Sequence, residues 1–279
     1  MSRFVDLHVH STASDGSYSP EELVEMACEI GLYAFAITDH DTIDGIPKAL
    51  RHASRLPVKV IPGVELSCSY KGSEVHILAY NFNMQDTLLK DALKQVSALR
   101  QQRSEKMCGL LRKQGFDITI DGLYNYFGSN TLTRASFALY MLAKGYVADK
   151  EEAYEKYLGE RCSCYVPRFK LSLEDAALLI KHSGAYGSVA HPVKYKMTDE
   201  EYMKLFLRSL QLGIGGIEAI YSTNTEKDEE KFCKMAADLG MYITGGTDYH
   251  GFLKPDINLG TGRGNLMIPD SLLKNIGCS

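Results

Sequence analysis

The chain has 279 residues, of which 45% are hydrophobic and 24% are charged, and its formal net charge is −4. This length fits one large domain or one domain with an insert. General nucleic-acid and membrane-surface binders are usually basic, so the charge argues against both classes. The sequence has no run of about 18 apolar residues, so we expect no membrane span. Seven scattered cysteines and the lack of a signal peptide favour reduced thiols and a cytoplasmic location.

The first third of the chain alternates predicted strands with predicted helices. Residues 4–8 and 33–38 have the pattern of strands, and the second is continuously apolar. Between them, Ser19 is typical of a helix N-cap, Pro20 of the first helical position and Gly31 of a helix end. A short helix is expected at 46–54, with further strands at 58–61 and 75–80.

The pattern changes after Phe82, where apolar residues keep helical spacing and no parallel strand is evident. The alternation then resumes, with helices expected at 173–183, 200–212 and 228–239 and strands at 186–190, 216–219 and 242–244. We therefore predict an α/β domain formed by residues 1–82 and 166–279, with a helical insert at 83–165. Repeated strand-helix units predict a parallel sheet, whose carboxyl ends would carry the functional site.

Six of the eight histidines lie in short strand-end contexts: His8, His10, His40, His76, His191 and His250. Residues i and i+2 of a strand point the same way, so His8 and His10 can reach one metal ion. Asp248 and His250 have the same spacing at the last predicted strand. Imidazole binds transition metals well, and this pattern predicts a metal site for hydrolytic chemistry.

Carboxylates accompany these histidines. Glu65 ends a predicted strand and could bridge two cations, since a carboxylate has two oxygens, and Asp15 lies in the loop after the first histidine pair. Asp39 and Asp41 flank His40, where they would either orient its imidazole or simply be solvated, with helix capping a further option for Asp41. The other two histidines, at positions 52 and 182, fall in helical stretches and are expected to be ordinary surface or core residues.

Five segments together resemble the motifs of the PHP (polymerase and histidinol phosphatase) phosphoesterase superfamily. They are residues 6–10 (DLHVH), 37–41 (ITDHD), 62–65 (PGVE), 189–192 (VAHP) and 246–250 (GTDYH). Residues 11–16 (STASDG) and 165–167 (YVP) resemble the branch that contains nucleotide-directed phosphatases and RNase AM-like 5′-3′ exoribonucleases. The resemblance covers nearly the whole chain, including the helical insert.

This resemblance implies a distorted (β/α)7 barrel with a small helical insertion domain covering the site, and a trinuclear metal centre. Carried over by position, the first metal would bind His8, His10, Glu65 and Asp248, the second Glu65, His76 and His191, and the third Asp15, His40 and His250. Two to three divalent ions are therefore expected, and the nitrogen and oxygen ligands suit manganese, iron or zinc. Glu65, Asp248 and His191 are the expected catalytic residues.

The predicted substrate contacts are fewer. Arg134 matches an arginine that binds phosphate in this branch, although Ser136 stands where the family usually has a histidine. Arg168, Lys194 and Ser222 fall in loops that could face the site.

The expected reaction is hydrolysis of a small phosphorylated metabolite, a nucleotide or nucleoside 3′,5′-bisphosphate, by attack of a metal-bridging hydroxide. One alternative is a phosphodiesterase, acting either as a 5′-3′ exoribonuclease on short RNA or on a cyclic phosphate. Others are a histidinol-phosphate phosphatase, a metallo-hydrolase of carbon-nitrogen bonds and a non-enzymatic metal-binding module. The expected partners are the small substrate or, under the alternative, short oligonucleotides; no membrane and no obligatory protein partner are expected.

Overall fold

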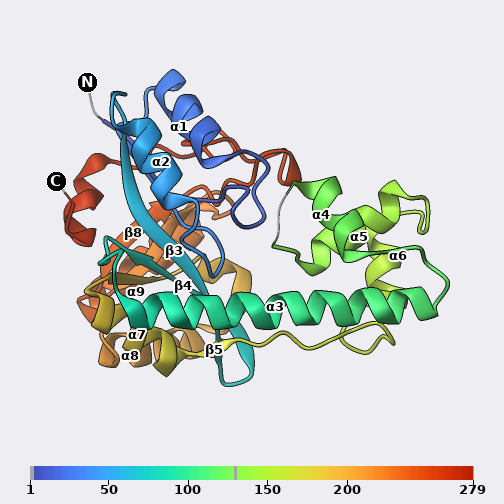
Figure 1. The fold of residues 1–279 in the computed structure, drawn as a ribbon. Helices are drawn as coiled ribbons and strands as arrows, with labels where there is room; N and C mark the ends of the chain where they lie inside the picture. The colour runs from blue at the N-terminus through green and yellow to red at the C-terminus, as the bar shows by residue number, and fades with distance from the viewer. Residues whose placement is uncertain (1–2, 129–130, 279) are drawn as a thin grey trace. The chain divides into compact units, whose positions relative to one another are not determined.

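The computed structural model describes residues 3–128 and 131–278, which form two compact units (Figure 1). We call Met1–Leu93 with Lys170–Ser279 the barrel unit, and Lys94–Phe169 the helical unit. The boundary between them falls within the long helix α3 (Thr87–Lys113). Within the described residues, no helix is both long and apolar enough to span a bilayer.

The barrel unit is built on an eight-stranded sheet in the order β1-β2-β3-β4-β6-β7-β8, with β5 paired to β3. The strands are β1 (Val5–Val9), β2 (Ala34–Ile37), β3 (Lys59–Tyr70), β4 (Ser73–Tyr80), β5 (Leu171–Ser172), β6 (Tyr186–Val189), β7 (Gly216–Tyr221) and β8 (Tyr242–Gly246). The α-helices of this unit, besides the start of α3, are α1 (Pro20–Glu29), α2 (Ile46–Ala53), α7 (Leu173–Ser183), α8 (Asp199–Gln211) and α9 (Glu226–Leu239). Short helical segments follow at η2 (Pro192–Tyr195), η3 (Gly251–Leu253) and η4 (Asp270–Ile276).

Helix boundaries in this unit follow the predicted capping chemistry. At α1, the Ser19 side chain accepts from the Glu22 amide and the Glu22 carboxylate accepts from the Ser19 amide, so the predicted N-terminus is confirmed. The same reciprocal cap begins α7, α8 and α9, at Ser172, Thr198 and Thr225. These caps fix where each helix starts after the strand that precedes it.

The sheet is not parallel throughout, and the expectation of a parallel sheet is wrong for β4. This strand runs antiparallel to both β3 and β6, whereas the other pairs are parallel. The cause is local: Lys71 and Gly72 have φ values of 49° and 84° and make a tight turn, too short for a parallel crossover. The third strand is also longer than predicted, so Glu65 lies in the middle of β3 rather than at its end.

The first and last strands meet and nearly close the sheet into a barrel. The amide of His10 donates to the carbonyl of Tyr249 at 3.0 Å, and the amide of Asp248 donates to the carbonyl of His8 at 2.8 Å. Apolar side chains such as Val5, Leu7 and Tyr80 fill part of the core of this unit. The predicted distorted barrel with a helical insertion is thus confirmed, and closure brings the carboxyl ends of β1 and β8 together.

The helical unit has its own core. It contains the rest of α3, α4 (Ile120–Phe127), α5 (Arg134–Ala143), α6 (Lys150–Ala153) and the π-helical segment η1 (Tyr154–Leu158). Its buried side chains include Met107, Leu111, Leu123, Phe137 and Met141. The helical spacing read in the sequence therefore reflects a separate apolar core rather than packing against a sheet.

Barrel closure requires a residue without a side chain at Gly246. A Cβ atom there would collide with the Cβ of His8 and lie 2.7 Å from its backbone nitrogen. We expect Gly246→Ala to lower the free energy of unfolding in urea by about 1–3 kcal/mol or more, because backbone cannot move aside as a side chain can.

Gly109→Ala is the matched control, since nothing lies within 4 Å of the added Cβ atom. In the interior of α3 this change should be neutral or slightly stabilising, by up to about 1 kcal/mol. Equal stabilities of the two variants would contradict the close approach of β1 and β8.

Candidate metal centre

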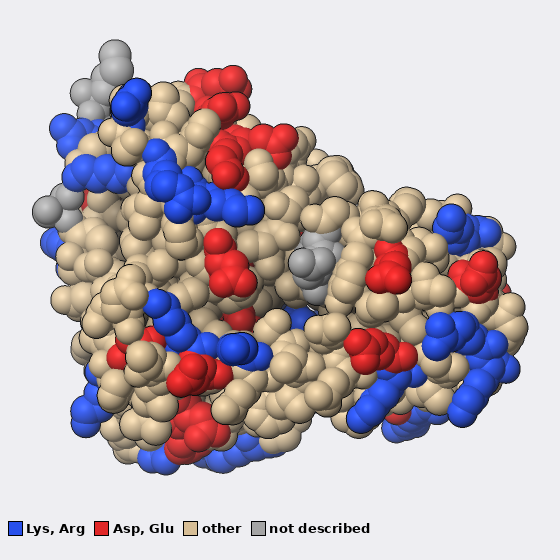
Figure 2. Space-filling model, viewed as in Figure 1, with Lys and Arg blue, Asp and Glu red and all other residues tan. Residues whose placement is uncertain are grey.

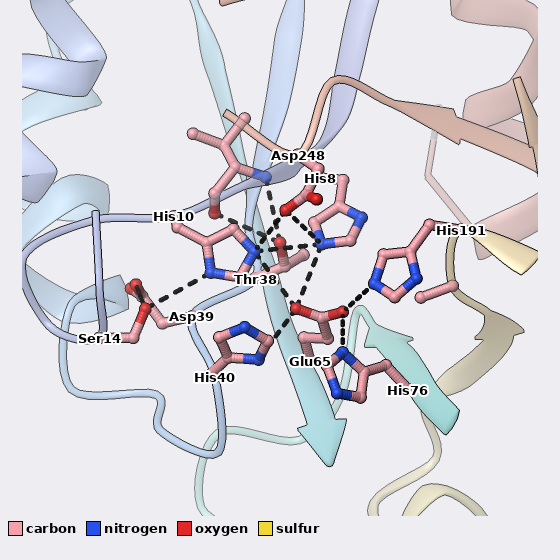
Figure 3. Close-up of polar contacts among 12 residues, drawn as sticks. His8, His10, Ser14, Thr38, Asp39, His40, Glu65, His76, His191 and Asp248 are labelled. Carbon is pink, nitrogen blue, oxygen red and sulfur yellow. Dashed lines mark hydrogen bonds and ion pairs between the residues drawn. The ribbon is translucent and has the colours of Figure 1, made fainter. Parts of the chain in front are cut away.

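The nine predicted ligands converge at the carboxyl rim of the barrel. Figure 3 shows His8, His10, His40, Glu65, His76, His191 and Asp248 among them. They come from β1 and the loop after it (His8, His10, Asp15), the loop after β2 (His40), β3 (Glu65), β4 (His76), the loop after β6 (His191) and the loop after β8 (Asp248, His250). Parallel strands deliver most of them because their carboxyl ends share one rim. His76 arrives from the antiparallel strand β4, opposite Ser67 of β3.

Glu65 lies at the centre of this group. Its Oε1 atom is 2.8 Å from His76 Nδ1 and 2.8 Å from His191 Nε2. Its Oε2 atom is 3.0 Å from His40 Nδ1 and 3.3 Å from the Nε2 atoms of both His8 and His10. Each oxygen thus faces its own set of imidazoles, which is the arrangement that a bridging carboxylate requires.

The ligand atoms form four overlapping groups, each with atoms within 4.8 Å of one another. These are His10, Asp15, His40 and His250; His8, Glu65 and His191; His8, His10 and Asp248; and His40, Glu65 and His76. The donors are imidazole nitrogens and carboxylate oxygens without a thiolate, a set that suits divalent transition metals. The groups share Glu65, His8, His10 and His40, so neighbouring cations could share ligands.

Unsatisfied buried atoms support this interpretation. Among the described residues, Glu65 Oε2, His40 Nδ1 and His191 Nδ1 are buried without a hydrogen-bond partner. The Nε2 atoms of His8 and His10 lie 3.1 Å apart, although two neutral imidazole nitrogens gain little from such contact unless one carries a proton. Buried polar atoms are nearly always hydrogen-bonded, and a cation would satisfy these lone pairs. The residues therefore fit divalent metal ions.

The electrostatics keep the central carboxylate ionised. Burial alone would raise the pKa of Glu65, but the surrounding histidines, led by His40 and His76, hold that pKa well below its usual range. Burial also opposes protonation of His10, yet the neighbouring carboxylates of Asp248 and Glu65 outweigh this and raise its pKa to about 9. The site thus has a strong demand for positive charge, which protons meet when no cation is bound.

Asp248 is held with one oxygen directed to the histidines. Its Oδ2 atom accepts hydrogen bonds from Lys194 Nζ at 2.6 Å, Lys254 Nζ at 2.8 Å and the Tyr221 hydroxyl at 2.7 Å. Its Oδ1 atom lies 3.3 Å from His10 Nε2 and 3.6 Å from His8 Nε2. Three donors on Oδ2 leave Oδ1 as the oxygen available to a metal. Lys194 was among the predicted site residues, whereas Lys254 and Tyr221 were missed.

Glu218 is the most important residue that the sequence analysis missed. Its Oε1 atom is 2.9 Å from His8 Nδ1, and its Oε2 atom accepts the backbone amide of His191 at 2.6 Å. It is fully buried in β7. A carboxylate in this position orients the imidazole of a ligand and directs its other nitrogen to the metal. The available signal was a lone acid within the otherwise apolar segment 216–221.

Asp6 ties the first and last strands together behind the ligands. It accepts the amides of His8, Thr247 and Gly260 at 3.2, 2.9 and 2.9 Å, and the Thr247 hydroxyl at 2.6 Å. This residue was also missed as part of the site, although it stands two positions before the first predicted ligand.

Asp39 and Asp41 brace loops. Asp39 accepts the amide and hydroxyl of Ser11 at 2.7 and 2.6 Å and the Ser14 hydroxyl at 2.5 Å. Asp41 accepts the amide of Ser67 at 2.8 Å. These contacts fix the loops that carry the ligands, a role different from the orientation of the His40 imidazole and from the solvation weighed above.

Backbone strain accumulates at the same rim. Asp41, His191 and Asp248 have φ values of 54°, 26° and 58°, which side-chain-bearing residues rarely adopt. Such conformations cost roughly 1–3 kcal/mol each and tend to occur at functional sites. Two of the three are predicted metal ligands.

The other three predicted substrate contacts lie in both units of the chain: Ser222 in the barrel unit, and Arg134 and Arg168 in the helical unit. Ser222 is buried and its hydroxyl donates to the carbonyl of Thr247 at 2.7 Å. Arg134 and Arg168 belong to the helical unit, where the Arg134 guanidinium lies 5.4 Å from the centre of the Tyr165 ring.

Three other residues of the sequence analysis have contacts outside the ligand groups. Ser136 caps α5, since its hydroxyl accepts the amide of Thr133 at 3.1 Å. The two histidines expected to be ordinary contact carboxylates outside those groups: His52 meets Glu25 at 3.1 Å and His182 meets Asp86 at 2.6 Å.

Comparison with known proteins agrees with this geometry. A 5′-3′ exoribonuclease of Haemophilus influenzae is 32% identical over 90% of this chain and 91% of its own length. A 3′,5′-nucleoside bisphosphate phosphatase of Chromobacterium violaceum is 31% identical over 88% of this chain and 87% of its own. A crystal structure from Bifidobacterium adolescentis, provisionally described as a metal-dependent phosphoesterase, superposes with a TM-score of 0.84 at 26% identity, covering 98% of this chain and 95% of that one.

The family model of the PHP domain matches residues 6–206, a span that contains seven of the nine predicted ligands. The resemblance read from the sequence motifs is therefore confirmed, and the chain belongs to the PHP domain family.

Proposed function

We propose that this metal-dependent phosphoesterase removes a phosphate group from a nucleoside 3′,5′-bisphosphate or a closely related nucleotide. The observation that carries the proposal is a cluster of four arginines in the helical unit, Arg100, Arg103, Arg134 and Arg168. A relative that acts on 3′,5′-nucleoside bisphosphates, by its name, supports the same substrate class. The metal centre of the barrel unit would act on a phosphate group, and the arginine cluster of the helical unit is proposed as an anion-binding site.

Two arginines of the cluster are buried. Arg100 and Arg103 are only 7% and 6% exposed. Burial, and then the positive charges of Arg168, Arg134 and Arg100, lower the pKa of Arg103 to about 10. Its Nε atom donates to the carbonyl of Val166 at 2.8 Å, which does not offset its charge. A phosphate would, because its oxygens match the planar fork of a guanidinium.

We further propose that the nine ligands bind two to three divalent ions. One would be held by His8, His10 and Asp248, one by His76 and His191, and one by Asp15, His40 and His250, with Glu65 shared by the first two. Divalent ions in such a site supply Lewis acidity and lower the pKa of water, which makes a nucleophile available at neutral pH. Manganese, iron and zinc all suit this ligand set.

The protein residues supply orientation and charge. Glu218 and Asp6 fix His8, so that the position of this predicted ligand is set before substrate binds. Lys194 and Lys254 bring two ammonium groups to the rim beside Asp248. We propose that Lys194 also contacts a phosphoryl oxygen of the substrate, because an ammonium group has three donors and only one is directed to Asp248.

A phosphodiesterase is the second candidate, and the similarity to a 5′-3′ exoribonuclease favours it. A long RNA would need many phosphate contacts. On the face shown in Figure 2, lysines and arginines are interspersed with acids rather than arranged in a continuous basic track. This charge distribution supports a small substrate or a short oligonucleotide. Histidinol phosphate fits less well, because its single phosphate comes with an ammonium group that an arginine cluster would repel.

A substrate panel tests the proposal directly. Protein expressed with added manganese would be assayed on nucleoside 3′,5′-bisphosphates, mononucleotides, short RNAs, cyclic phosphates and histidinol phosphate. We expect the highest kcat/KM with bisphosphates and release of inorganic phosphate. A preference for diesters or for histidinol phosphate would overturn the proposal in favour of the corresponding alternative.

Glu65→Gln should greatly reduce both metal content and activity. The amide cannot offer two anionic oxygens to neighbouring cations, so we expect a loss of at least about 10³-fold in kcat/KM. Metal content would be measured by elemental analysis and the fold by circular dichroism. Glu25→Gln is the matched control, because Glu25 also contacts a histidine, His52, but lies outside the metal-ligating groups. Full metal content and turnover in Glu65→Gln would contradict the bridging role.

Arg134→Ala should weaken bisphosphate binding selectively. Loss of a charge-assisted hydrogen bond predicts a rise in KM of roughly 10- to 100-fold for a bisphosphate, with little change for a mononucleotide. The exposed Arg112 provides the control variant Arg112→Ala. If the two substrates responded equally to Arg134→Ala, a role in holding a second phosphate would be excluded.

A further inference from the structure

The segment that follows the last metal-ligating histidine carries an exposed aromatic ring. Phe252 lies in η3, two residues after His250 and two before Lys254. Its side chain is 66% exposed. Both neighbours belong to the site, since His250 Nε2 lies 3.5 Å from Asp15 Oδ1 and Lys254 Nζ bonds to Asp248 Oδ2. Phe252 therefore lies in a turn whose two flanks contact residues of the metal centre.

The backbone around this ring is fixed on its N-terminal side. Gly251 has a φ of 69°, and a Cβ atom there would lie 2.7 Å from the Ser17 hydroxyl and 2.8 Å from the Tyr18 ring. The hydroxyl and amide of Ser17 both donate to the carbonyl of His250, at 2.5 and 3.1 Å. These contacts hold the start of η3 against the loop after β1.

The C-terminal side is equally constrained. The amide of Lys254 donates to the carbonyl of Gly251 at 3.0 Å, which closes a turn around Phe252. The Lys254 side chain then returns to Asp248, where Nζ lies 2.8 Å from Oδ2. The ring projects from a turn that is anchored at both ends, so its exposure does not come from a loose loop.

An exposed phenylalanine in this position has no evident structural purpose. Exposed apolar side chains forgo the free energy that burial would contribute. Among the described residues, no aromatic ring or cation is found stacked on Phe252. Its ring is therefore exposed in the segment that also carries Asp248 and His250.

We propose that Phe252 is a stacking surface for the purine or pyrimidine base of the substrate, with Lys254 as the positioning residue that fixes its turn. This inference rests on the proposed function and narrows it, because a base-stacking ring selects nucleotides over other small phosphate esters. Every nucleobase has a π-face, so stacking accommodates different bases. The chemistry at phosphorus would be left to the metal centre, and the ring would affect binding alone.

A matched pair of substrates isolates the base. These are 2′-deoxyadenosine 3′,5′-bisphosphate and its abasic counterpart, in which a tetrahydrofuran ring carries the same two phosphates. For Phe252→Ala we expect KM to rise roughly 5- to 150-fold on the nucleotide. On the abasic compound, KM should stay within about twofold of the unmodified protein. Phe252→Trp should restore the nucleotide KM, whereas Phe252→Leu, which is apolar without a π-face, should not.

Met267→Ala serves as the control for loss of an exposed apolar side chain, because Met267 is 74% exposed and adjoins Ile268, which bonds to the amino end of β1. It should leave both KM values unchanged. Metal content and melting temperature should be the same in all variants, which separates stacking from damage to the site.

Fluorescence gives a readout that does not depend on turnover. The chain contains no tryptophan, so Phe252→Trp introduces a single indole at the rim. Titration with 2′-deoxyadenosine 5′-monophosphate should quench its emission saturably, and the abasic 5-phosphate should not. If neither bisphosphate is hydrolysed but the quenching occurs, the proposed function fails and the base site stands.

The opposite result is equally distinct. If the unmodified protein hydrolyses both bisphosphates but Phe252→Ala changes their KM values equally or not at all, the base site is overturned and the proposed function stands. Absence of quenching would also overturn it. If Phe252→Ala changed the oligomeric state measured by sedimentation but left the nucleotide KM unchanged, the base site would also be overturned. The ring would then be assigned to contact with a second copy of the chain.

Discussion

The structure depends on one buried charge, the carboxylate of Glu65. It is fully buried in the middle of β3, where an ionised group is tolerated only if positive charge or hydrogen-bond donors surround it. Five histidines from four parts of the chain supply this environment, through contacts of 2.8–3.3 Å with its two oxygens. Those parts are β1, the loop after β2, β4 and the loop after β6. A barrel rim meets this requirement because it is the place where so many strand ends can approach one central side chain.

Three other buried carboxylates surround the groups that contact Glu65. Asp6 and Glu218 hold the imidazole and backbone groups next to Glu65, and burial raises the pKa of both. Asp248 behaves differently: burial would raise its pKa, but Lys194 and Lys254 hold it well below its usual range. Glu65 and Asp248 therefore keep negative charge at the rim, and two lysines contact Asp248. Divalent ions held by the predicted ligands would balance this charge.

The residues that converge at the rim could be predicted from the sequence better than the sheet that presents them. Strand-end histidines at i and i+2 are a local signal, and His8 with His10 could be read directly from their spacing. A strand was predicted at 75–80, but the antiparallel direction of β4 was not, because the two-residue turn at Lys71 and Gly72 looks like any loop in the sequence. Glu218 was missed because its partner His8 is 210 residues away, and only the closed barrel brings the two together. Lys254 was missed although its partner Asp248 is only 6 residues away, because the contact depends on the turn between them.

Specificity in this molecule is separable from catalysis. The ligand set around Glu65 can serve any phosphate ester, since it recognises metal ions and oxygen atoms rather than the rest of the substrate. Under the proposed function, discrimination would come from groups that contact other parts of the substrate: the arginines of the helical unit for an anion, and Phe252 for a base. Arginines attract any oxyanion but lose strength as salt screens them, whereas an aromatic face accepts only flat, apolar surfaces and is insensitive to salt. Changes at these residues would then shift the preference among nucleotide substrates, while every predicted metal ligand stays in place.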